Sequence, residues 1–336
     1  MQGHFSFDLF NYYLSLRKGQ NILKLLHSFF MKLQTAEMKP VIRDAVKIIF
    51  IAIPLFFSFY SVEAQLKKAL IVGIGNYPTE NGWNQIHGDN DVPLIKSSLL
   101  ENGFQEENII YLVDQQATKK NIELQLDKLI TAAQPNDIFY IHFSTHGQQV
   151  LDVNGDEADS LDEAIIPYDA MKDPVEGGYN GENHFLDDEL NVYLSQIREK
   201  IGNGGSILVM LDACHSGDAT RGRETDNDSV FVRGTSDIFH MDPERAHQTS
   251  PAQPLEWVAI SAAKSYQNNY EYKLGDDYFG SLSYAVSLAF KGLPPNINFI
   301  ELFELINRAR TEMKIGSYPQ NPTIDGDNIY QKQKAF

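Results

Sequence analysis

From residue 66 onward the chain alternates short apolar runs with amphipathic stretches, and this alternation limits the fold more than any other feature. The apolar runs are nearly continuous, as strands are when helices cover both faces of a parallel sheet. The expected strands span 67–75, 108–114, 137–144, 205–213 and 256–262, and the expected helices span 91–104, 119–133, 187–201, 280–290 and 299–313. This order predicts one α/β domain over residues 66–336, with a mostly parallel central sheet and helices on both faces.

Two of the expected strands are followed directly by reactive side chains. His146 follows one strand in "FSTHGQQ", and Cys214 follows another in "LDACHSG". Catalytic groups gather at the carboxyl ends of parallel strands, so we expect both side chains at one edge of the sheet. A nearby histidine can hold a thiol as the nucleophilic thiolate. The small residues around Gly147 and Cys214 would let backbone N–H groups approach a substrate carbonyl.

Each of these features also has an ordinary structural explanation. Cys214 is the only cysteine, so it forms no internal disulfide, and a lone cysteine is more often a small buried hydrophobe. His142, on the same strand as the His146 motif, is expected in the core, and His215 is expected to point away from Cys214. The pairing of the two strand-end motifs is what favours a catalytic dyad.

The charge balance limits the class of partner. The chain has 45 acidic and 28 basic residues, for a formal net charge of −17. This balance argues against binding to nucleic acid or to an anionic membrane, because both need basic patches. It is compatible with a basic substrate or a bound cation. We expect the protein to act as a monomer.

Residues 38–64 have the pattern of an export signal. Lys39, Arg43 and Lys47 form a basic region, an apolar run follows from 48 to 62, and small residues precede a cleavage point after Ala64. The apolar run is short for a membrane span, which needs roughly 20 residues. We therefore expect export to the periplasm or the extracellular space, with an uncleaved membrane anchor as the alternative. Residues 1–37 precede this signal and are interpreted as an over-long start.

Several motifs together resemble those of a known family. They are "FSTHGQQ", "DACHSG", the acidic segment 152–170, "KKALIVGIGNYP", "GDNDV" and the C-terminal "QNPTIDGDNIYQKQKAF". They resemble the metacaspases and bacterial caspase-like cysteine peptidases. The resemblance implies a caspase-hemoglobinase fold and hydrolysis of peptide bonds through a thioacyl enzyme. In that chemistry Cys214 is the nucleophile, His146 is the base and acid, and the amides of Gly147 and Cys214 hold the oxyanion.

The sequence also departs from the pattern of that family. Ser144-Thr145 stands where the family has Ser-Gly, and Asp89 and Ala213 stand where many metacaspases have further cysteines. We assign no third member of the dyad. A catalytically silent binding scaffold and a legumain-like or gingipain-like peptidase are the alternatives that we keep.

The resemblance further implies a substrate pocket that selects a basic residue. Asp212, two residues before the cysteine, and Asp91 map to the pocket acids, with Ser144 between them. Two carboxylates in a partly closed pocket bind a guanidinium or ammonium group through charge-assisted hydrogen bonds. The alternative for Asp212 is that it only caps the turn after its strand.

The polar segment 218–252 is expected to be a long exposed loop that the enzyme itself cuts. It offers Arg221, Arg223 and Arg233 as cleavage points. A cut there would separate a large piece with both catalytic residues from a smaller C-terminal piece. The alternative is an ordinary exposed loop that other proteases trim.

Calcium is the one cofactor that the acidic residues suggest. The stretch 152–163 superficially fits an EF-hand loop, but it lacks the required glycine and we reject it. The resemblance implies instead Asp162, Asp187 and Asp188, with Asp218 as a substitute for a family acid whose position holds Arg221. Asp187 and Asp188 could also be favourable charges at a helix N-terminus.

Overall fold

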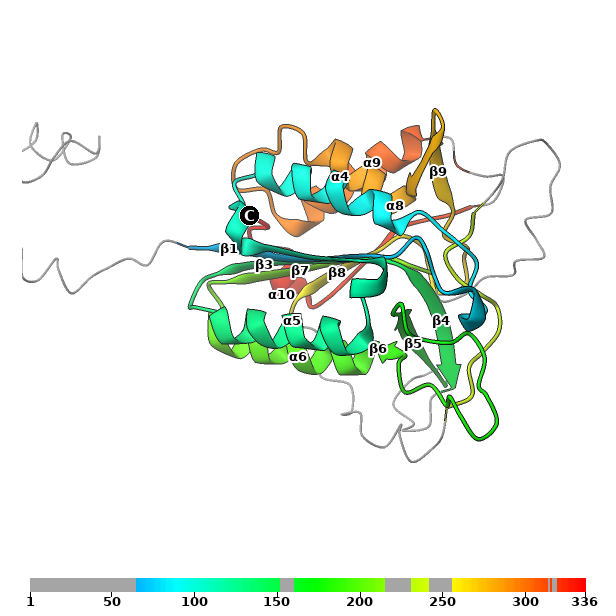
Figure 1. Cartoon of the computed structure of the whole chain (residues 1–336). Helices are drawn as coiled ribbons and strands as arrows, with labels where there is room; N and C mark the ends of the chain where they lie inside the picture. The colour runs from blue at the N-terminus through cyan, green and yellow to red at the C-terminus, as the bar shows by residue number, and fades with distance from the viewer. Residues whose placement is uncertain (1–64, 152–159, 215–230, 242–255, 314, 316–318) are drawn as a thin grey trace, which may run out of the picture. The chain divides into compact units, whose positions relative to one another are not determined.

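Within the described part of the chain, the central sheet has six strands, and five of them run parallel. The computed structural model describes residues 65–151, 160–214, 231–241, 256–313, 315 and 319–336 (Figure 1). Across the sheet the strands follow in the order β11 (Thr323–Asp325), β8 (Val258–Ser261), β7 (Ser206–Asp212), β3 (Ile138–Ser144), β1 (Lys67–Gly73) and β2 (Ile109–Val113). Only β11 pairs antiparallel, with β8. The mostly parallel sheet of the sequence analysis is confirmed.

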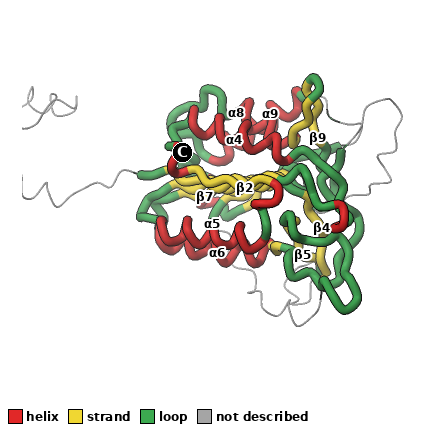
Figure 2. Tube along the Cα trace, in the orientation of Figure 1, coloured by secondary structure: helices red, strands yellow, loops and turns green. Residues whose placement is uncertain are grey.

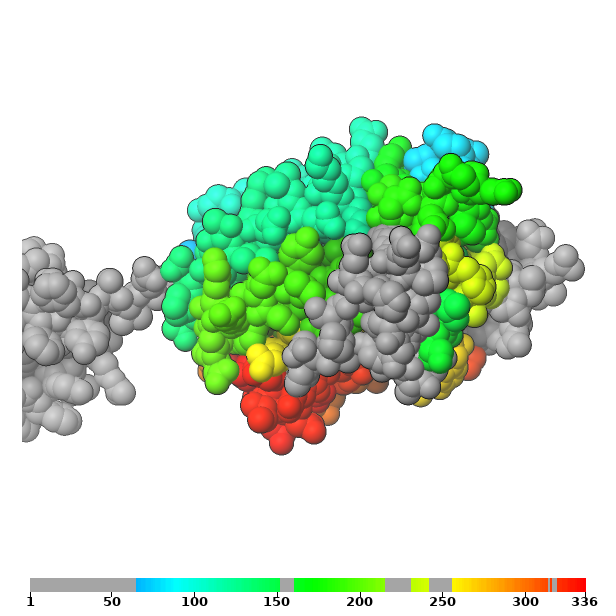
Figure 3. Space-filling model, turned by 90° about the horizontal axis from the view of Figure 1, so that it is seen from below, coloured from blue at the N-terminus to red at the C-terminus, as the bar shows by residue number. Residues whose placement is uncertain are grey.

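Helices cover both faces of this sheet. One face carries α4 (Gly88–Glu101), α8 (Ser281–Ala289) and α9 (Phe299–Glu312), and the other carries α5 (Lys119–Ala132) and α6 (Asp187–Ile201) (Figure 1). A short α10 (Asn328–Gln331) precedes the C-terminus. Figure 3 looks onto the face that α5 and α6 cover. The layered α/β arrangement is that of the caspase-hemoglobinase fold.

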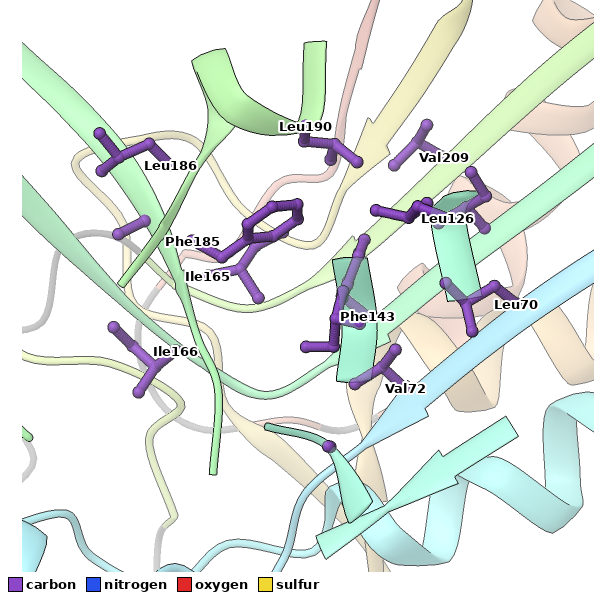
Figure 4. Packing of buried hydrophobic residues seen from close by; sticks show 14 of the residues in the cluster. Leu70, Val72, Leu126, Phe143, Ile165, Ile166, Phe185, Leu186, Leu190 and Val209 are labelled. Carbon is purple, nitrogen blue, oxygen red and sulfur yellow. The ribbon is translucent and has the colours of Figure 1, made fainter. Parts of the chain in front are cut away.

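Each face of the sheet buries its own apolar cluster. Every residue of β3 is buried, as its unbroken apolar sequence predicts. Alternate side chains of β1 point to opposite faces: Leu70 and Val72 pack towards α5 and α6, whereas Ala69 and Ile71 pack towards α4 and α8. Figure 4 shows Phe143 of β3 among the residues of the first cluster. The two clusters fix the sheet between the helical layers and so hold its carboxyl edge in place.

The helix after β1 begins earlier than its apolar spacing predicts. It starts at Gly88 rather than at residue 91. A side chain at Gly88 would overlap the backbone oxygens of Ser144 and Ile74, so only glycine lets the helix begin this close to the sheet edge. As a result Asp91 lies in the first turn of α4, directly at the carboxyl ends of β1 and β3.

Two small sheets at the carboxyl edge were not expected from the sequence. One consists of β4 (His146–Leu151), β5 (Leu161–Ile166) and β6 (Phe185–Leu186), and the other is the hairpin of β9 (Glu271–Leu274) and β10 (Asp277–Gly280). Their strands are short and mix polar with apolar residues, so neither sequence has a clear period. Both sheets border the edge where His146 and Cys214 were expected.

The expected exposed loop at 218–252 is wrong for its described central part. Residues 231–241 are held by backbone pairing: Leu151 N donates to Phe239 O at 3.0 Å, and Phe239 N donates to Gln149 O at 2.8 Å. The same segment pairs with residue 270 at its other end. Figure 2 shows loops in green beside β4 and β5 at this edge of the sheet. Arg221, Arg223 and Asp218, like residues 1–64, lie outside the described residues.

Residues Gln65–Phe336 form one compact unit. Among its described helices, none combines the length and the apolar character that crossing a bilayer requires.

Candidate active site

His146 and Cys214 leave the sheet from neighbouring strands. β3 and β7 pair in parallel, and the last pair in their register is Ser144 with Asp212. His146 therefore follows one strand by two residues, and Cys214 follows the other by the same number. This is the juxtaposition that the strand-end motifs predict.

A backbone contact fixes which nitrogen of His146 can act as a base. Nε2 lies 2.9 Å from the carbonyl oxygen of Asn84. A carbonyl oxygen only accepts hydrogen bonds, so Nε2 carries the proton and Nδ1 keeps its lone pair. Nδ1 is buried and has no hydrogen-bond partner among the described residues. The carbonyl of Asn84 takes the orienting role for which the sequence analysis found no residue.

Aromatic rings shield the imidazole of His146 from solvent. Its ring stacks on Trp83 at a centroid distance of 4.9 Å and lies 5.1 Å from the ring of Tyr77. Burial lowers the pKa of His146 to about 4, which the bond to Asn84 only partly opposes. The imidazole is therefore neutral, as a general base must be, at any pH well above that value.

Cys214 is buried, and its thiol has a partner. Sγ donates to the carbonyl oxygen of Gln267 at 3.0 Å. The backbone amide of Cys214 points elsewhere, towards the carbonyl oxygen of Arg233 at 2.9 Å. The amide of Gly147 donates to that same oxygen at 3.1 Å. Two amides that converge on one carbonyl oxygen form the geometry of an oxyanion hole.

The side chain of Arg233 lies in the predicted basic-residue pocket. Its Nη2 donates to Asp91 Oδ2 at 2.9 Å, and its Nη1 bonds to Ser144 Oγ. The ion pair with Asp212 is longer, since its Oδ1 lies 3.9 Å from Nη1 of Arg233. Arg233 is fully buried, and carboxylates replace the water that would surround a guanidinium in an exposed loop.

Asp212 has a second task, which differs from the expected alternative of capping the turn after its own strand. Its Oδ2 accepts from the amide and the hydroxyl of Ser283 in the first turn of α8, both at 2.7 Å. Oδ1 accepts from Asn269 at 2.7 Å. Asp212 therefore caps a helix while it contributes negative charge to the pocket. His142 belongs to the same network, since Nε2 contacts Ser283 Oγ at 2.9 Å, and it is a core residue as expected.

Glu271 is a third pocket carboxylate that the motifs did not predict. Its Oε1 accepts from both Nε and Nη2 of Arg233, at 3.0 and 2.9 Å. The amide of His87 donates to Glu271 Oε1 at 2.7 Å, and Nδ1 of His87 lies 2.6 Å from Glu271 Oε2. Glu271 lies at the start of β9, in a polar stretch of the sequence. Only the contacts that the fold gives Glu271 identify it as a residue of the pocket.

The charges of the pocket shift the pKa values of its acids. Burial raises the pKa of Asp91 to about 7, because the guanidinium of Arg233 offsets only part of the cost and Asp212 repels. Burial also opposes ionisation of Glu271, but Arg233 and His87 outweigh it and lower its pKa. The hydrogen bond to Glu271 raises the pKa of His87. The pocket is thus tuned for a buried cation.

The predicted calcium ligands lie apart from this pocket. Asp162 is on β5, and Asp187 and Asp188 begin α6. Burial raises the pKa of Asp187, and so does repulsion from Glu163, Asp188 and Asp162. Carboxylate oxygens are the ligands that Ca²⁺ prefers. Within the described ranges, however, no three such groups come together in the geometry of a metal site.

Residues 67–221 match the family "Metacaspase, peptidase C14 domain". Metacaspase-1 of Eremothecium gossypii is 28% identical over 306 residues, which are 77% of this chain and 63% of that protein. Metacaspase-1B of Aspergillus fumigatus is 36% identical over 216 residues, which are 62% of this chain and 46% of that protein. The chain thus spans less than two thirds of the length of either relative.

A solved structure supports the fold alone. A protein of Geobacter sulfurreducens has a TM-score of 0.55 at 21% identity, and the match covers 80% of this chain and 97% of that one. The fold and the paired strand-end motifs are those of a caspase-like domain. Over residues 67–221 the chain is similar to the metacaspase peptidase C14 domain, and its relatives above are metacaspases.

Proposed function

We propose that this protein is a cysteine endopeptidase that cleaves after basic residues, arginine above all, and that its own Arg233–Gly234 bond is a substrate. One observation carries the proposal. The carbonyl oxygen of Arg233 accepts from the amides of Gly147 and Cys214, while its guanidinium lies between acidic side chains. An arginine whose carbonyl oxygen and side chain are both bound in this way is positioned as a substrate residue is before attack.

The chemistry follows from the groups around that bond. His146 Nδ1 takes the thiol proton, and Sγ of Cys214 attacks the carbonyl carbon of Arg233. The negative charge that develops on the carbonyl oxygen is stabilised by the two amides. The protonated imidazole then gives its proton to the nitrogen of Gly234, which leaves as a new amino terminus. Water hydrolyses the thioester and regenerates the thiol.

The thiol must change partner before this sequence starts. Its present bond to the carbonyl of Gln267 keeps it protonated. Attack requires the S–H group to turn from Gln267 to Nδ1 of His146. We expect this rotation, rather than the acidity of the histidine, to control the first cut.

A peptide assay tests the activity on other substrates. Peptides that copy residues 231–236 (Phe-Val-Arg-Gly-Thr-Ser), with arginine kept or replaced by lysine, aspartate or alanine, are incubated with the purified 65–336 chain. We expect cleavage after arginine and lysine only, and none with the Cys214→Ala variant. Preferential cleavage after aspartate, or equal cleavage by the Cys214→Ala variant, would contradict the proposal.

We further propose that Ca²⁺ stimulates this activity from outside the pocket. Asp162, Asp187 and Asp188 supply hard oxygen ligands, and Asp218 is the proposed fourth. The raised pKa of Asp187 is compatible with a cation site, because a bound cation would offset the repulsion between these carboxylates. Terbium luminescence, a probe for calcium sites, should be strong with the native chain and weak with Asp187→Ala/Asp188→Ala. Equal luminescence from both, or activity that a chelator leaves unchanged, would refute the proposal.

Export is a separate proposal that rests on residues 38–64. Their basic, apolar and small-residue regions support cleavage after Ala64. N-terminal sequencing of the protein from its native cells should find Gln65 first. A chain that keeps residues 38–64 and sediments with membranes would support the anchor instead.

A further inference from the structure

Residues 231–233 are bound as an added strand. Arg233 N donates to the carbonyl of Asn269 at 3.0 Å, and Glu271 N donates to the carbonyl of Phe231 at 3.1 Å. Val232 is the antiparallel bridge partner of Tyr270. Strand addition of this kind binds through the main chain and gains specificity through alternate side chains. The alternate side chains are those of Arg233 and Phe231, which point to the same side.

The ring of Phe231 is held by two aromatic side chains. It meets His87 at a centroid distance of 4.7 Å and Tyr278 at 4.8 Å, in both cases edge-on. The rings of His87 and Tyr278 stack on each other at a centroid distance of 4.9 Å and an interplanar angle of 22°. Edge-to-face contacts are a favoured geometry for aromatic rings.

This aromatic site is continuous with the arginine pocket. The ring of His87 contacts Phe231, and its Nδ1 lies 2.6 Å from Glu271 Oε2. Tyr278 lies on β10, which pairs residue by residue with β9, and Glu271 is the first residue of β9. A substrate strand that places arginine in the pocket therefore also brings the side chain two residues earlier onto these rings.

We propose that His87 and Tyr278 form a subsite for an aromatic residue two positions before the cleaved arginine. The inference rests on the proposed peptidase function and names its substrate class: extended peptides of the pattern aromatic-X-Arg, cut after the arginine. The chain's own Phe231-Val232-Arg233 is the first example of that pattern. Other substrates occupy the same strand position once this segment has been cut and has left.

The test measures kcat/KM of the self-processed enzyme on two peptides, Phe-Val-Arg-Gly-Thr-Ser and Ala-Val-Arg-Gly-Thr-Ser. We expect the native enzyme to prefer the first about tenfold, which is the typical gain from such ring contacts. Tyr278→Ala should lower that preference to about twofold or less, because it slows cleavage of the phenylalanine peptide more than that of the alanine peptide. Tyr278→Phe keeps the ring and should keep the preference.

Tyr111→Ala removes a half-exposed tyrosine from β2, away from this site, and serves as the matched control. It should retain the native preference. Equal cleavage of both peptides by the native enzyme would overturn the subsite, as would a Tyr278→Ala variant that loses both activities in equal proportion. If the native enzyme cuts neither peptide, the peptidase proposal itself fails, and this outcome is distinct from the other two.

Discussion

Arginine and lysine differ at the atom that Glu271 contacts. Oε1 of Glu271 accepts from Nε of Arg233 at 3.0 Å. A lysine in the same pocket carries a methylene group at that position, so Oε1 loses the donor that Nε supplies and keeps the amide of His87. Under the proposed function, we therefore expect the third acid to favour arginine over lysine.

We therefore predict that Glu271→Gln lowers the ratio of kcat/KM for arginine over lysine peptides by about tenfold. The arginine peptide should lose most, since the lysine peptide never used that oxygen. Asp276→Asn removes the same charge from the exposed tip of the same hairpin and is the control. A ratio that Glu271→Gln leaves unchanged would assign Glu271 to fold stability alone.

Asp91 should make cleavage after arginine sensitive to pH. Its pKa is raised to about 7, so the carboxyl group gains a proton as the pH falls through that value. The protonated form attracts the guanidinium of a substrate less strongly, whereas His146 stays neutral down to about pH 4. We predict that kcat/KM for an arginine peptide falls below about pH 7.

The Asp91→Asn variant identifies the source of that fall. It should be less active at pH 8 than the native enzyme, and its profile should be flat between pH 6 and 8. If the variant keeps the native acid limb, another group controls it.

At the scale of elements, the turn from β10 into α8 forms one wall of the arginine pocket. Gly280 N donates to both carboxylate oxygens of Asp91, at 3.0 and 3.1 Å. A Cβ at Gly280 would overlap the carboxylate of Asp212 and come within 2.7 Å of Arg233 Nη1. The backbone there is ordinary, with φ −59° and ψ 135°, so alanine would fill the pocket without straining the turn.

Gly280→Ala is predicted to slow self-cleavage at least tenfold, because steric exclusion of the guanidinium removes charge-assisted hydrogen bonds. Alkylation of Cys214 by iodoacetamide should be no slower, since a displaced Arg233 segment uncovers the thiol. The control is Gly178→Ala, whose added Cβ meets only Val175 at 3.4 Å or more. Loss of both self-cleavage and alkylation would indicate a misfolded site instead of a filled pocket.

The sequence predicted the elements with a clear period, and it missed those that depend on distant partners. Unbroken apolar runs such as residues 138–144 defined the sheet, and the motifs at its carboxyl edge placed His146 beside Cys214 in expectation. The hairpin that carries Glu271 and Tyr278 has neither a period nor a motif. The role of these residues depends on the fold, which brings the hairpin to the start of α4. There His87 contacts Glu271 at a sequence separation of 184.

The fate of residues 231–241 shows the same limit. A polar composition with scattered glycines predicted an exposed loop. The carboxylates of three separate elements, α4, β7 and β9, bury Arg233 instead. No local pattern encodes such a pocket, although the choice of arginine as a cleavage residue was available from the sequence.

At the scale of the whole molecule, the proposed function would make the chain its own first substrate, because the segment is docked in the site. Arg233 fills the pocket, its carbonyl oxygen occupies the oxyanion hole, and Phe231 covers the rings of His87 and Tyr278. The uncut protein therefore cannot accept another peptide at the same place. We expect cleavage of its own chain to precede cleavage of any other.

The most direct measurement is mass spectrometry with N-terminal sequencing of the purified 65–336 chain over time. We predict a new amino terminus at Gly234 in the native protein, an intact chain for Cys214→Ala, and a cut at least tenfold slower for Arg233→Ala, which removes every charged contact of the pocket. A Cys214→Ala protein that yields the same fragments would contradict the account. A native protein that is cut only after Arg221 or Arg223, with the bond at Gly234 intact, would contradict it equally.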